Sequence, residues 1–449
     1  MELHLNQNLI KFAKTLCSPL YVVGGAVRNA LLDGKIDDVD LAASILAEDF
    51  SKSLIKFGFH VNAVYPRTGT VNFSDGERNY EYTAFRRERY EGGSHVPIST
   101  EFTCNIMEDA LRRDFKCNAV YFDLGDGKIV DPLGGVQDIE NRVLDTVKEA
   151  EKVFCSDGLR LMRLARFAGE LNFAPTSSVL SAMEKYADNI LDISAERIYS
   201  ELSKILHADK KYDFSNPQGH YVGLKILDQT KVLDRILPEL TEGRGMAQRS
   251  DFHKYDVLEH SLRCALYADD KVRLAALLHD VGKPFCLKRD GKYYLHFSEG
   301  VKIADKILKR LKVDKKTSAK VKKLIYLHMV DLDCSMKESK VRSFIVDNMD
   351  LLDELIAVKQ TDFRASLETH EVCPTIAKWK IIYNKMKADG TPFSLNEMKI
   401  SAKDLIELGF IGEMIGKELK KLFNLVVKYP KNNDRERLIK LARAHLLKT

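Results

Sequence analysis

Hydrophobic and polar residues follow two different periodicities along this chain, and the change between them predicts the architecture. Up to about residue 144, short apolar or alternating segments typical of strands are interspersed with helical segments. From residue 145 onward, apolar residues recur with the spacing of helices. We therefore predict an α+β fold, a small mixed-sheet head followed by an all-α body. The predicted strands are 20–23, 61–65, 70–73 and 80–85, and the first predicted helices are 1–19, 26–32 and 46–57.

The composition changes this picture little. With 449 residues, 45% apolar and 30% charged, the chain is typical of a soluble protein of two to four domains. A net charge of +5 is modest, so any nucleic-acid surface must be a local patch. The eight cysteines show no CxxC pair and no ligand-like spacing, which predicts reduced, mostly buried thiols. We expect no signal peptide, no membrane span and a cytoplasmic location.

The first candidate chemistry lies where the first strand ends. Gly24 and Gly25 break the strand before a helix and leave backbone N–H groups free for a phosphate, with Arg28 in the first turn. Asp38 and Asp40, two apart in an extended segment, project to the same face, where a divalent cation would relieve their repulsion. Each feature alone is usually structural. Together they indicate phosphoryl or nucleotidyl transfer with two metal ions.

A second group of metal-capable residues lies in the helical body. Histidines and aspartates recur in the order H, HD, H, H, D, at His260, His279, Asp280, His296, His328 and Asp362. A single helical histidine is usually a satisfied core residue. Several on neighbouring helices, with an adjacent His-Asp pair, predict a buried divalent-metal site.

The stretch from Leu20 to Ala42 resembles the polymerase-β-like head of the bacterial tRNA CCA-adding enzyme and poly(A) polymerase family, whose signature is GGxVRD followed by DxD. Asn29 stands where the family has Asp, a change that we expect to affect local hydrogen bonding and not the metal ligands. The resemblance implies that Asp38 and Asp40 bind Mg²⁺ and that the glycines and Arg28 hold a triphosphate.

Three further motifs extend the resemblance. YEYTAFR is similar to the family's EVTTFR, which implies that Glu81 is a third catalytic carboxylate. RRDFKCNA is similar to RRDFTINA, and Asp157 with Arg160 matches EDxxR, which reads the incoming base through acceptors and donors that imitate a Watson–Crick edge. Ser156 replaces the Glu of that motif, so base selectivity is expected to be looser or differently supported. The implied nucleotide-binding residues are Gly24, Gly25, Arg28, Arg112, Arg113, Asp114, Asn118, Asp157, Arg160, Arg163 and Arg166.

Residues 86–107 are polar and poor in periodicity, which predicts a mobile functional loop. In the family, the corresponding loop is needed for the switch from adding C to adding A. Because the loop is not deleted here, the resemblance favours full CCA addition. Turn-forming residues also cluster near 213–220 and 241–251, where we expect linkers, and Asp131–Gly135 matches a structural DPxGG turn.

The histidine-rich region resembles the HD phosphohydrolase superfamily. The likeness implies that His260, His279, Asp280 and Asp362 bind a metal and that His296 and His328 bind a second ion or the substrate phosphate. The runs 302–323 and 411–449 carry ten basic residues each, against two and four acidic ones. Such faces suit tRNA phosphates, and the C-terminal run resembles the tRNA-binding tail of family members.

We therefore predict a CCA-adding tRNA nucleotidyltransferase that uses CTP, ATP and Mg²⁺, with tRNA as partner, and with metal-dependent phosphohydrolase activity in the HD domain. Its oligomeric state is left open as monomer or homodimer. The alternatives are an A-adding enzyme, a bacterial poly(A) polymerase, an HD phosphohydrolase with a degenerate head, and a non-enzymatic RNA chaperone. The predicted domains are the head (1–144), a helical nucleotide-recognition domain (145–240), the HD domain (250–370) and a tRNA-binding tail (371–449).

Overall fold

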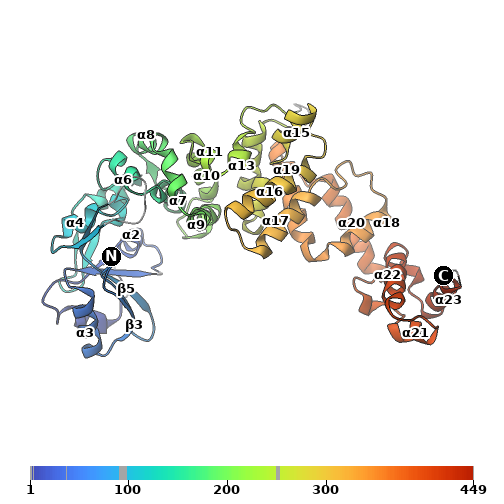
Figure 1. Cartoon of the computed structure of the whole chain (residues 1–449), viewed down its shortest axis with the longest axis horizontal. Helices are drawn as coiled ribbons and strands as arrows, with labels where there is room; N and C mark the ends of the chain where they lie inside the picture. The colour runs from blue at the N-terminus through green and yellow to red at the C-terminus, as the bar shows by residue number, and fades with distance from the viewer. Residues whose placement is uncertain (1–2, 4, 37, 90–98, 249–252, 448–449) are drawn as a thin grey trace. The chain divides into compact units, whose positions relative to one another are not determined.

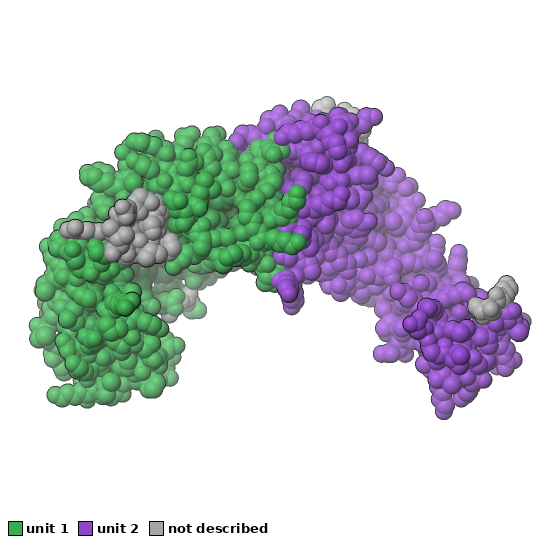
Figure 2. All heavy atoms as spheres, in the orientation of Figure 1, with its two compact units in different colours: residues 1–242, 306–314 green, residues 243–305, 315–449 purple. Residues whose placement is uncertain are grey.

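The computed structural model describes residues 3, 5–36, 38–89, 99–248 and 253–447. The chain forms two compact units, one of residues 1–242 and 306–314 and the other of residues 243–305 and 315–449 (Figure 2). Among the described residues, none of the helices combines the length and the apolar character that a membrane crossing requires. Each unit is described by itself below.

A seven-stranded mixed sheet forms the start of the first unit, in the order β3-β4-β5-β2-β1-β8-β9. Its central strand β2 runs antiparallel to β1 and parallel to β5. The strands are β1 Tyr21–Val23, β2 Val39–Ala43, β3 His60–Tyr65, β4 Thr70–Ser74, β5 Asn79–Ala84, β8 Tyr121–Asp123 and β9 Lys128–Val130. This sheet and the helices that follow confirm the predicted α+β fold (Figure 1).

Aromatic packing fixes helix α3 (Ala47–Phe57) on this sheet. Phe50 stacks on Tyr82 of β5 with 3.6 Å between the ring centroids, and both side chains are fully buried. Phe12 of α1 (Gln7–Ala13) meets Phe50 edge to face at 5.6 Å. Gly58 ends α3 in the left-handed conformation, with φ of 101°. One face of the sheet is thereby buried where these rings pack.

The rest of the first unit is helical, apart from two short strand pairs, β6 (Arg86–Arg89) with β7 (Ser99–Phe102) and β10 (Val143–Leu144) with β11 (Ala174–Pro175). Helix α7 packs closely against α10, because a Cβ on Gly169 would lie 2.3 Å from the Gly219 carbonyl oxygen. The expected linker near 213–220 is therefore a tight turn inside this unit. The helices are α2 Gly25–Leu31, α4 Ile106–Leu111, α5 Gly135–Glu140, α6 Ala150–Ser156, α7 Leu159–Leu171, α8 Ser177–Lys185, α9 Ala195–Leu206, α10 Gly219–Gln229, α11 Val232–Ile236 and α12 Pro238–Thr241.

The second unit is built from helices in its described residues. Helix α13 packs against α14 and α19, and α17 closes the group by packing on both of them. Ile400, Leu405, Leu422 and Leu438 are the centre of a separate small core near the C-terminus. The helices are α13 Val257–Tyr267, α14 Arg273–Leu278, α15 Lys283–Asp290, α16 His296–Arg310, α17 Lys315–Leu327, α18 Glu338–Asp347, α19 Leu352–Leu367, α20 Pro374–Ala388, α21 Ala402–Glu407, α22 Glu413–Lys428 and α23 Arg435–Leu446.

The predicted mobile loop at 86–107 is wrong for its described part. Strands β6 and β7 pair antiparallel, with Arg87 opposite Glu101, and an ion pair of 3.1 Å joins these two side chains. Helix α4 then begins at Ile106. Residues 90–98, between the strands, lie outside the described residues. The hydrophobic pattern missed this hairpin because both of its strands are polar.

Candidate functional sites

One cleft of about 830 Å³ in the first unit collects the head residues that the sequence singled out. Every predicted nucleotide-binding residue lines it, together with Asp38 and Asp40. Glu81 is not among the lining residues, although it neighbours Asp40 on the sheet. The wall is rich in cations, as a triphosphate site requires.

The carboxylates are brought together by strand register. Parallel pairing of β2 with β5 sets Glu81 directly beside Asp40, and β1 brings Val23 opposite Asp40 on the other side. Desolvation in the cleft raises the pKa of Asp40, and the negative charges of Glu81 and Asp38 add to that rise, while Arg113 opposes it. Three mutually repelling carboxylates with oxygen ligands suit Mg²⁺.

Gly24 leaves space beside these carboxylates. Its φ is 79°, and a Cβ there would lie 3.6 Å from Asp40 Oδ2 and 3.8 Å from Arg113 Nη1. The turn therefore brings bare backbone next to both a carboxylate and a guanidinium. A phosphate with its metal can approach the main chain at this point.

Arg28 is buried and held in place from several sides. Its Nη2 donates to Asn29 Oδ1 at 2.9 Å and to the Tyr212 hydroxyl at 3.2 Å, and its Nη1 donates to Asn118 Oδ1. Asn29 also donates from Nδ2 to the Lys35 carbonyl oxygen at 3.1 Å. The Asn in place of the family's Asp thus takes part in local hydrogen bonding, as expected.

Arg112 and Arg113 share one buried carboxylate. Arg112 Nε lies 2.7 Å from Asp109 Oδ1, and Arg113 Nη2 lies 3.1 Å from Asp109 Oδ2, which also accepts from the Tyr121 hydroxyl at 2.7 Å. Burial alone would raise the pKa of Asp109, but the two guanidiniums lower it to about 2. Asp109 therefore stays ionised and orients both arginines toward the cleft.

The base-reading pair predicted from EDxxR is in place, with different support. Arg160 donates from Nη2 to the Arg112 carbonyl oxygen at 2.7 Å and from Nη1 to Ser156 Oγ at 3.2 Å. Its Nε lies 3.9 Å from Asp157 Oδ2, and Asp157 Oδ1 accepts the Leu159 N–H at 2.9 Å. A hydroxyl and a main-chain carbonyl hold the guanidinium here.

Two of the predicted nucleotide-binding arginines are tied into ion pairs. Arg163 Nε donates to Asp114 Oδ2 at 2.7 Å, and Arg166 Nε donates to Glu201 Oε2 at 2.7 Å. Burial opposes ionisation of Asp114, but Arg163 and Arg160 hold its pKa well below the ordinary value. These two arginines shape the cleft wall through their partners.

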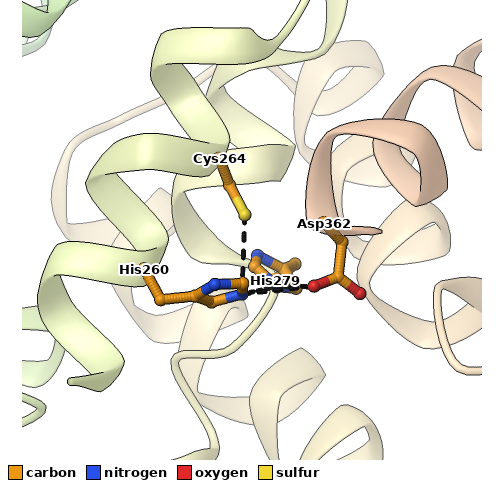
Figure 3. Close-up of side chains that lie close together, drawn as sticks. All are labelled: His260, Cys264, His279 and Asp362. Atoms are coloured by element: carbon orange, nitrogen blue, oxygen red, sulfur yellow. Dashed lines mark hydrogen bonds and ion pairs between the residues drawn. The ribbon is translucent and has the colours of Figure 1, made fainter. Parts of the chain in front are cut away.

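The second cluster lies among buried helices of the second unit (Figure 3). His260 and Cys264 project from α13, one turn apart, toward His279 and toward Asp362 of α19. One ligand atom from each of these four residues lies within 4.8 Å of the others. A second group of the same kind joins His279, Asp280 and His328. The predicted ligands thus converge.

Hydrogen bonding fixes the histidine tautomers. The Nδ1 atoms of His279, His296 and His328 lie 2.7–2.8 Å from backbone carbonyl oxygens, so each Nδ1 carries the proton and each Nε2 offers a lone pair. The Nε2 atoms of His260 and His279 lie 3.4 Å apart, and those of His296 and His328 lie 3.3 Å apart. This orientation is the one that metal-binding histidines adopt.

The buried carboxylates of the cluster also favour binding of a cation. Burial disfavours a charged imidazole, but Asp280 and Asp362 raise the pKa of His279 to about 10. Burial raises the pKa of the Cys264 thiol well above its ordinary value, and Asp362 and Asp280 raise it further. In the absence of an ion, the cluster would therefore take up protons, and a divalent metal fits the same place.

Sequence reasoning missed three residues that the fold adds. The cysteine spacing alone does not predict Cys264 as a metal ligand, because no CxxC pair is present. However, Cys264 follows His260 by four residues, a spacing that puts both on one helix face. Lys283, whose Nζ lies 2.6 Å from Asp280 Oδ2, follows that aspartate by three residues. Tyr212, which contacts Arg28, comes from a distant segment and has no local signal.

The basic run 302–323 is partly neutralised within each unit. Lys302, Lys320, Lys322 and Lys323 form ion pairs in the second unit, and Arg310 and Lys312 do so in the first. The face therefore carries less free charge than the sequence count implies. Exposed lysine pairs contribute little to stability, so they can still exchange partners for phosphates.

Comparisons with known proteins match three regions of the chain. Residues 20–145 match the family described as "Poly A polymerase head domain", residues 172–243 match "Probable RNA and SrmB- binding site of polymerase A", and residues 253–355 match "HD domain". Asp362 lies beyond the last match.

Relatives of known name fall in one group. The chain is 31% identical to an A-adding tRNA nucleotidyltransferase of Deinococcus radiodurans, over 77% of this chain and 76% of that protein. It is 39% identical to the CCA-adding enzyme of Geobacillus stearothermophilus, over 41% of this chain and 45% of that protein, so this match spans less than half of the relative. The crystal structure of the Bacillus stearothermophilus CCA-adding enzyme in complex with CTP has the same fold, with a TM-score of 0.66 and 24% identity over 98% of each chain.

Proposed function

We propose that this chain adds C, C and A to the 3′ end of tRNA from CTP and ATP. The chain belongs to the family of CCA-adding and A-adding tRNA nucleotidyltransferases. The observation that carries this proposal is the cleft in which Asp38 and Asp40, the Gly24 turn, and Asp157 with Arg160 meet. We further propose the predicted division into head, nucleotide-recognition domain, HD domain and tRNA-binding tail, and a cytoplasmic location.

In the proposed reaction, Asp38 and Asp40 would hold two Mg²⁺ ions, and Glu81 would support them from the neighbouring strand. When bound, these ions lower the pKa of the attacking 3′-hydroxyl and neutralise the charge on the departing pyrophosphate. Arg112 and Arg113, held toward the cleft by Asp109, bind the triphosphate. The backbone at Gly24 and the guanidinium of Arg28 complete the phosphate site.

Selection of the base is assigned to Asp157 and Arg160. The carboxylate accepts and the guanidinium donates, so the pair can match the Watson–Crick edge of cytosine or adenine without a template. Support for this role comes from their position in the cleft and from the hydrogen bonds that fix Arg160.

The proposal is tested with a tRNA transcript that lacks its last three nucleotides, given CTP alone, ATP alone, or both, with Mg²⁺. Growth by two residues with CTP and by three with both supports CCA addition. Extension only of a transcript already ending in CC, by one A, would identify an A-adding enzyme instead. Unlimited A addition would identify a poly(A) polymerase.

A control for this assay uses Asp38→Ala. We expect the variant to lose incorporation while it binds tRNA almost as well as the unchanged protein, because tRNA contacts are distributed over cations elsewhere. Incorporation by Asp38→Ala at the unchanged rate would refute the assignment of the metal ligands.

A second activity is favoured by the buried cluster of the second unit. We propose that His260, His279, Asp280 and Asp362 hold a divalent metal and that His296 and His328 bind a second ion or the substrate phosphate. When bound, the metal supplies an activated water for hydrolysis of a phosphoester. The test is release of p-nitrophenol from its phosphomonoester and phosphodiester by protein carrying added divalent metals. If neither is hydrolysed with any metal, the second unit has no such activity on small phosphoesters.

A further inference from the structure

We propose that Cys264 is a thiolate ligand of the metal centre in the second unit, and that it tunes this centre toward a thiophilic ion such as Zn²⁺ over Mg²⁺ or Mn²⁺. The inference rests on the proposed metal site of the HD domain and revises its ligands: Cys264, which the HD pattern does not contain, takes the fourth position in place of Asp280. Soft thiolate ligands favour Zn²⁺, whereas carboxylate and water suit Mg²⁺ and Mn²⁺.

Placement on α13 brings the thiol into the cluster. His260 and Cys264 are separated by one helical turn, and both are fully buried. Cys264 Sγ lies 3.5 Å from His260 Nε2, and its other close polar contact is the Thr361 carbonyl oxygen at 3.9 Å. Figure 3 shows the sulfur directed at the same imidazole that faces Asp362 and His279.

Four of the six distances between the ligand atoms are close to those of a tetrahedral metal site, and all six are at most 4.8 Å. With Zn–S of about 2.3 Å, Zn–N of about 2.05 Å and Zn–O of about 2.1 Å, tetrahedral angles put S and N about 3.6 Å apart, two N about 3.3 Å and N and O about 3.4 Å. The structure has 3.5 Å from Cys264 Sγ to His260 Nε2 and 3.4 Å between the Nε2 atoms of His260 and His279. Asp362 Oδ1 lies 3.2 Å and 3.6 Å from those two nitrogens.

Asp280 Oδ2 lies 3.4 Å and 3.2 Å from the Nε2 atoms of His260 and His279, but charge balance favours Cys264 over Asp280 as the fourth ligand. Lys283 Nζ lies 2.6 Å from Asp280 Oδ2, so this buried carboxylate already has an ammonium partner. A divalent ion held by one thiolate, the Asp362 carboxylate and two neutral imidazoles is neutral as a whole. A buried site favours such neutrality. The thiol proton leaves to solvent when the ion binds.

The experiment uses Co²⁺ as a spectroscopic probe in the full chain. Bound Co²⁺ gives visible d–d bands with any ligands, but a strong near-ultraviolet charge-transfer band only with a thiolate. We expect both in the unchanged protein. Cys264→Ser should keep the visible bands and lose the near-ultraviolet band. The matched control is Cys286→Ser, which changes a thiol that is equally buried in the same unit but lies outside the cluster.

The outcomes separate the two proposals. If no visible band is lost on replacing His279 by Ala, Co²⁺ does not bind at the cluster and the metal site itself is refuted. If Co²⁺ binds there without the near-ultraviolet band, or if the band persists in Cys264→Ser, the metal site stands and the thiolate ligand is refuted.

A measurement on the unchanged protein avoids any folding defect of the variant. X-ray absorption at the zinc edge should show one sulfur at about 2.3 Å, and a shell of nitrogen and oxygen alone would overturn the inference. In competition between Zn²⁺ and Mn²⁺, Cys264→Ser should lower the preference for Zn²⁺ by at least about 100-fold, since even outer-shell partners of metal ligands contribute about 10–100-fold in affinity.

Discussion

The two clusters of metal-capable side chains differ in the atoms that they offer and in their surroundings. In the head, Asp38, Asp40 and Glu81 offer only oxygen: Glu81 pairs with Asp40 on neighbouring interior strands, and Asp38 and Asp40 line a cleft rich in arginines. In the second unit, imidazole, thiol and carboxylate groups converge inside a helical core. Oxygen ligands in an open cleft suit a Mg²⁺ that arrives with the nucleotide. Buried nitrogen and sulfur ligands suit an ion that stays.

The difference shows that metal-capable side chains are oriented in two ways. Strand register is enough to set carboxylates side by side, and their mutual repulsion leaves a place for cations. The histidines instead depend on backbone carbonyl oxygens that fix each ring, such as the Ala276 carbonyl oxygen 2.7 Å from His279 Nδ1. The buried site should therefore hold its metal more tightly, and the open site should depend more on its substrate.

The largest expected effect comes from the head carboxylates. Asp40→Asn should lower nucleotide incorporation at least about 10³-fold, because metal stabilisation worth about 4 kcal/mol is lost. Single-turnover incorporation of labelled CTP measures the loss. The metal content of the second unit should not change, which metal analysis after gel filtration checks. A parallel loss of that metal would contradict the independence of the two sites.

Removing a buried ligand of the second unit should weaken metal binding there and leave nucleotide incorporation unchanged. The expected change is somewhat smaller than the loss of incorporation in Asp40→Asn. His279→Ala leaves the ion with one imidazole fewer and should weaken its retention by about 100-fold or more. Dialysis against a chelator series, followed by metal analysis, gives the affinity. Incorporation of CTP and ATP by the head should continue at the unchanged rate. If the variant stays folded but also loses nucleotide incorporation, the two sites do not function independently.

The head arginines offer a test by pH. Since Asp109 has a folded-state pKa of about 2, below its ordinary 3.8, its ionised form stabilises the fold above pH 4, and this contribution is lost as pH falls toward 2. The shift corresponds to roughly 2 kcal/mol. Asp109→Asn should therefore be destabilised at pH 7, and the gap to the unchanged protein should narrow below pH 4. Urea unfolding at several pH values measures it, and a gap that is constant with pH would refute this account.

How much the sequence predicted depends on how local the signal is. The Gly-Gly turn and the Asp38–Asp40 pair are predictable because each is set by a few neighbouring residues, and the histidines because their order along the chain is itself the signal. A motif implies that Glu81 is a third carboxylate of the head, and strand pairing sets it beside Asp40. The β6–β7 hairpin was missed because both strands are polar and present no apolar face to the pattern.

The other features that the sequence did not predict depend on tertiary contacts between distant segments. Tyr212 reaches Arg28 across 184 positions of sequence, which no local pattern encodes. Cys264 carried a usable signal, the i, i+4 spacing from His260, but only the fold shows that this helix face meets Asp362. The neutral support of Arg160 likewise depends on the Arg112 carbonyl oxygen, 48 residues away.

The smallest expected effect concerns the hydrogen bonds that hold Arg160 in the head. Ser156→Ala removes one acceptor, at 3.2 Å from Arg160 Nη1, but leaves the Arg112 carbonyl oxygen at 2.7 Å. Because one hydrogen bond contributes about 0.5–1.5 kcal/mol, misincorporation of UTP and GTP relative to CTP and ATP should rise only about 2–12-fold. Ser156→Glu restores the family's acid and should lower misincorporation below that of the unchanged chain. Identical error rates in all three proteins would show that backbone carbonyls alone fix the base-reading arginine, as they fix the histidines of the other site.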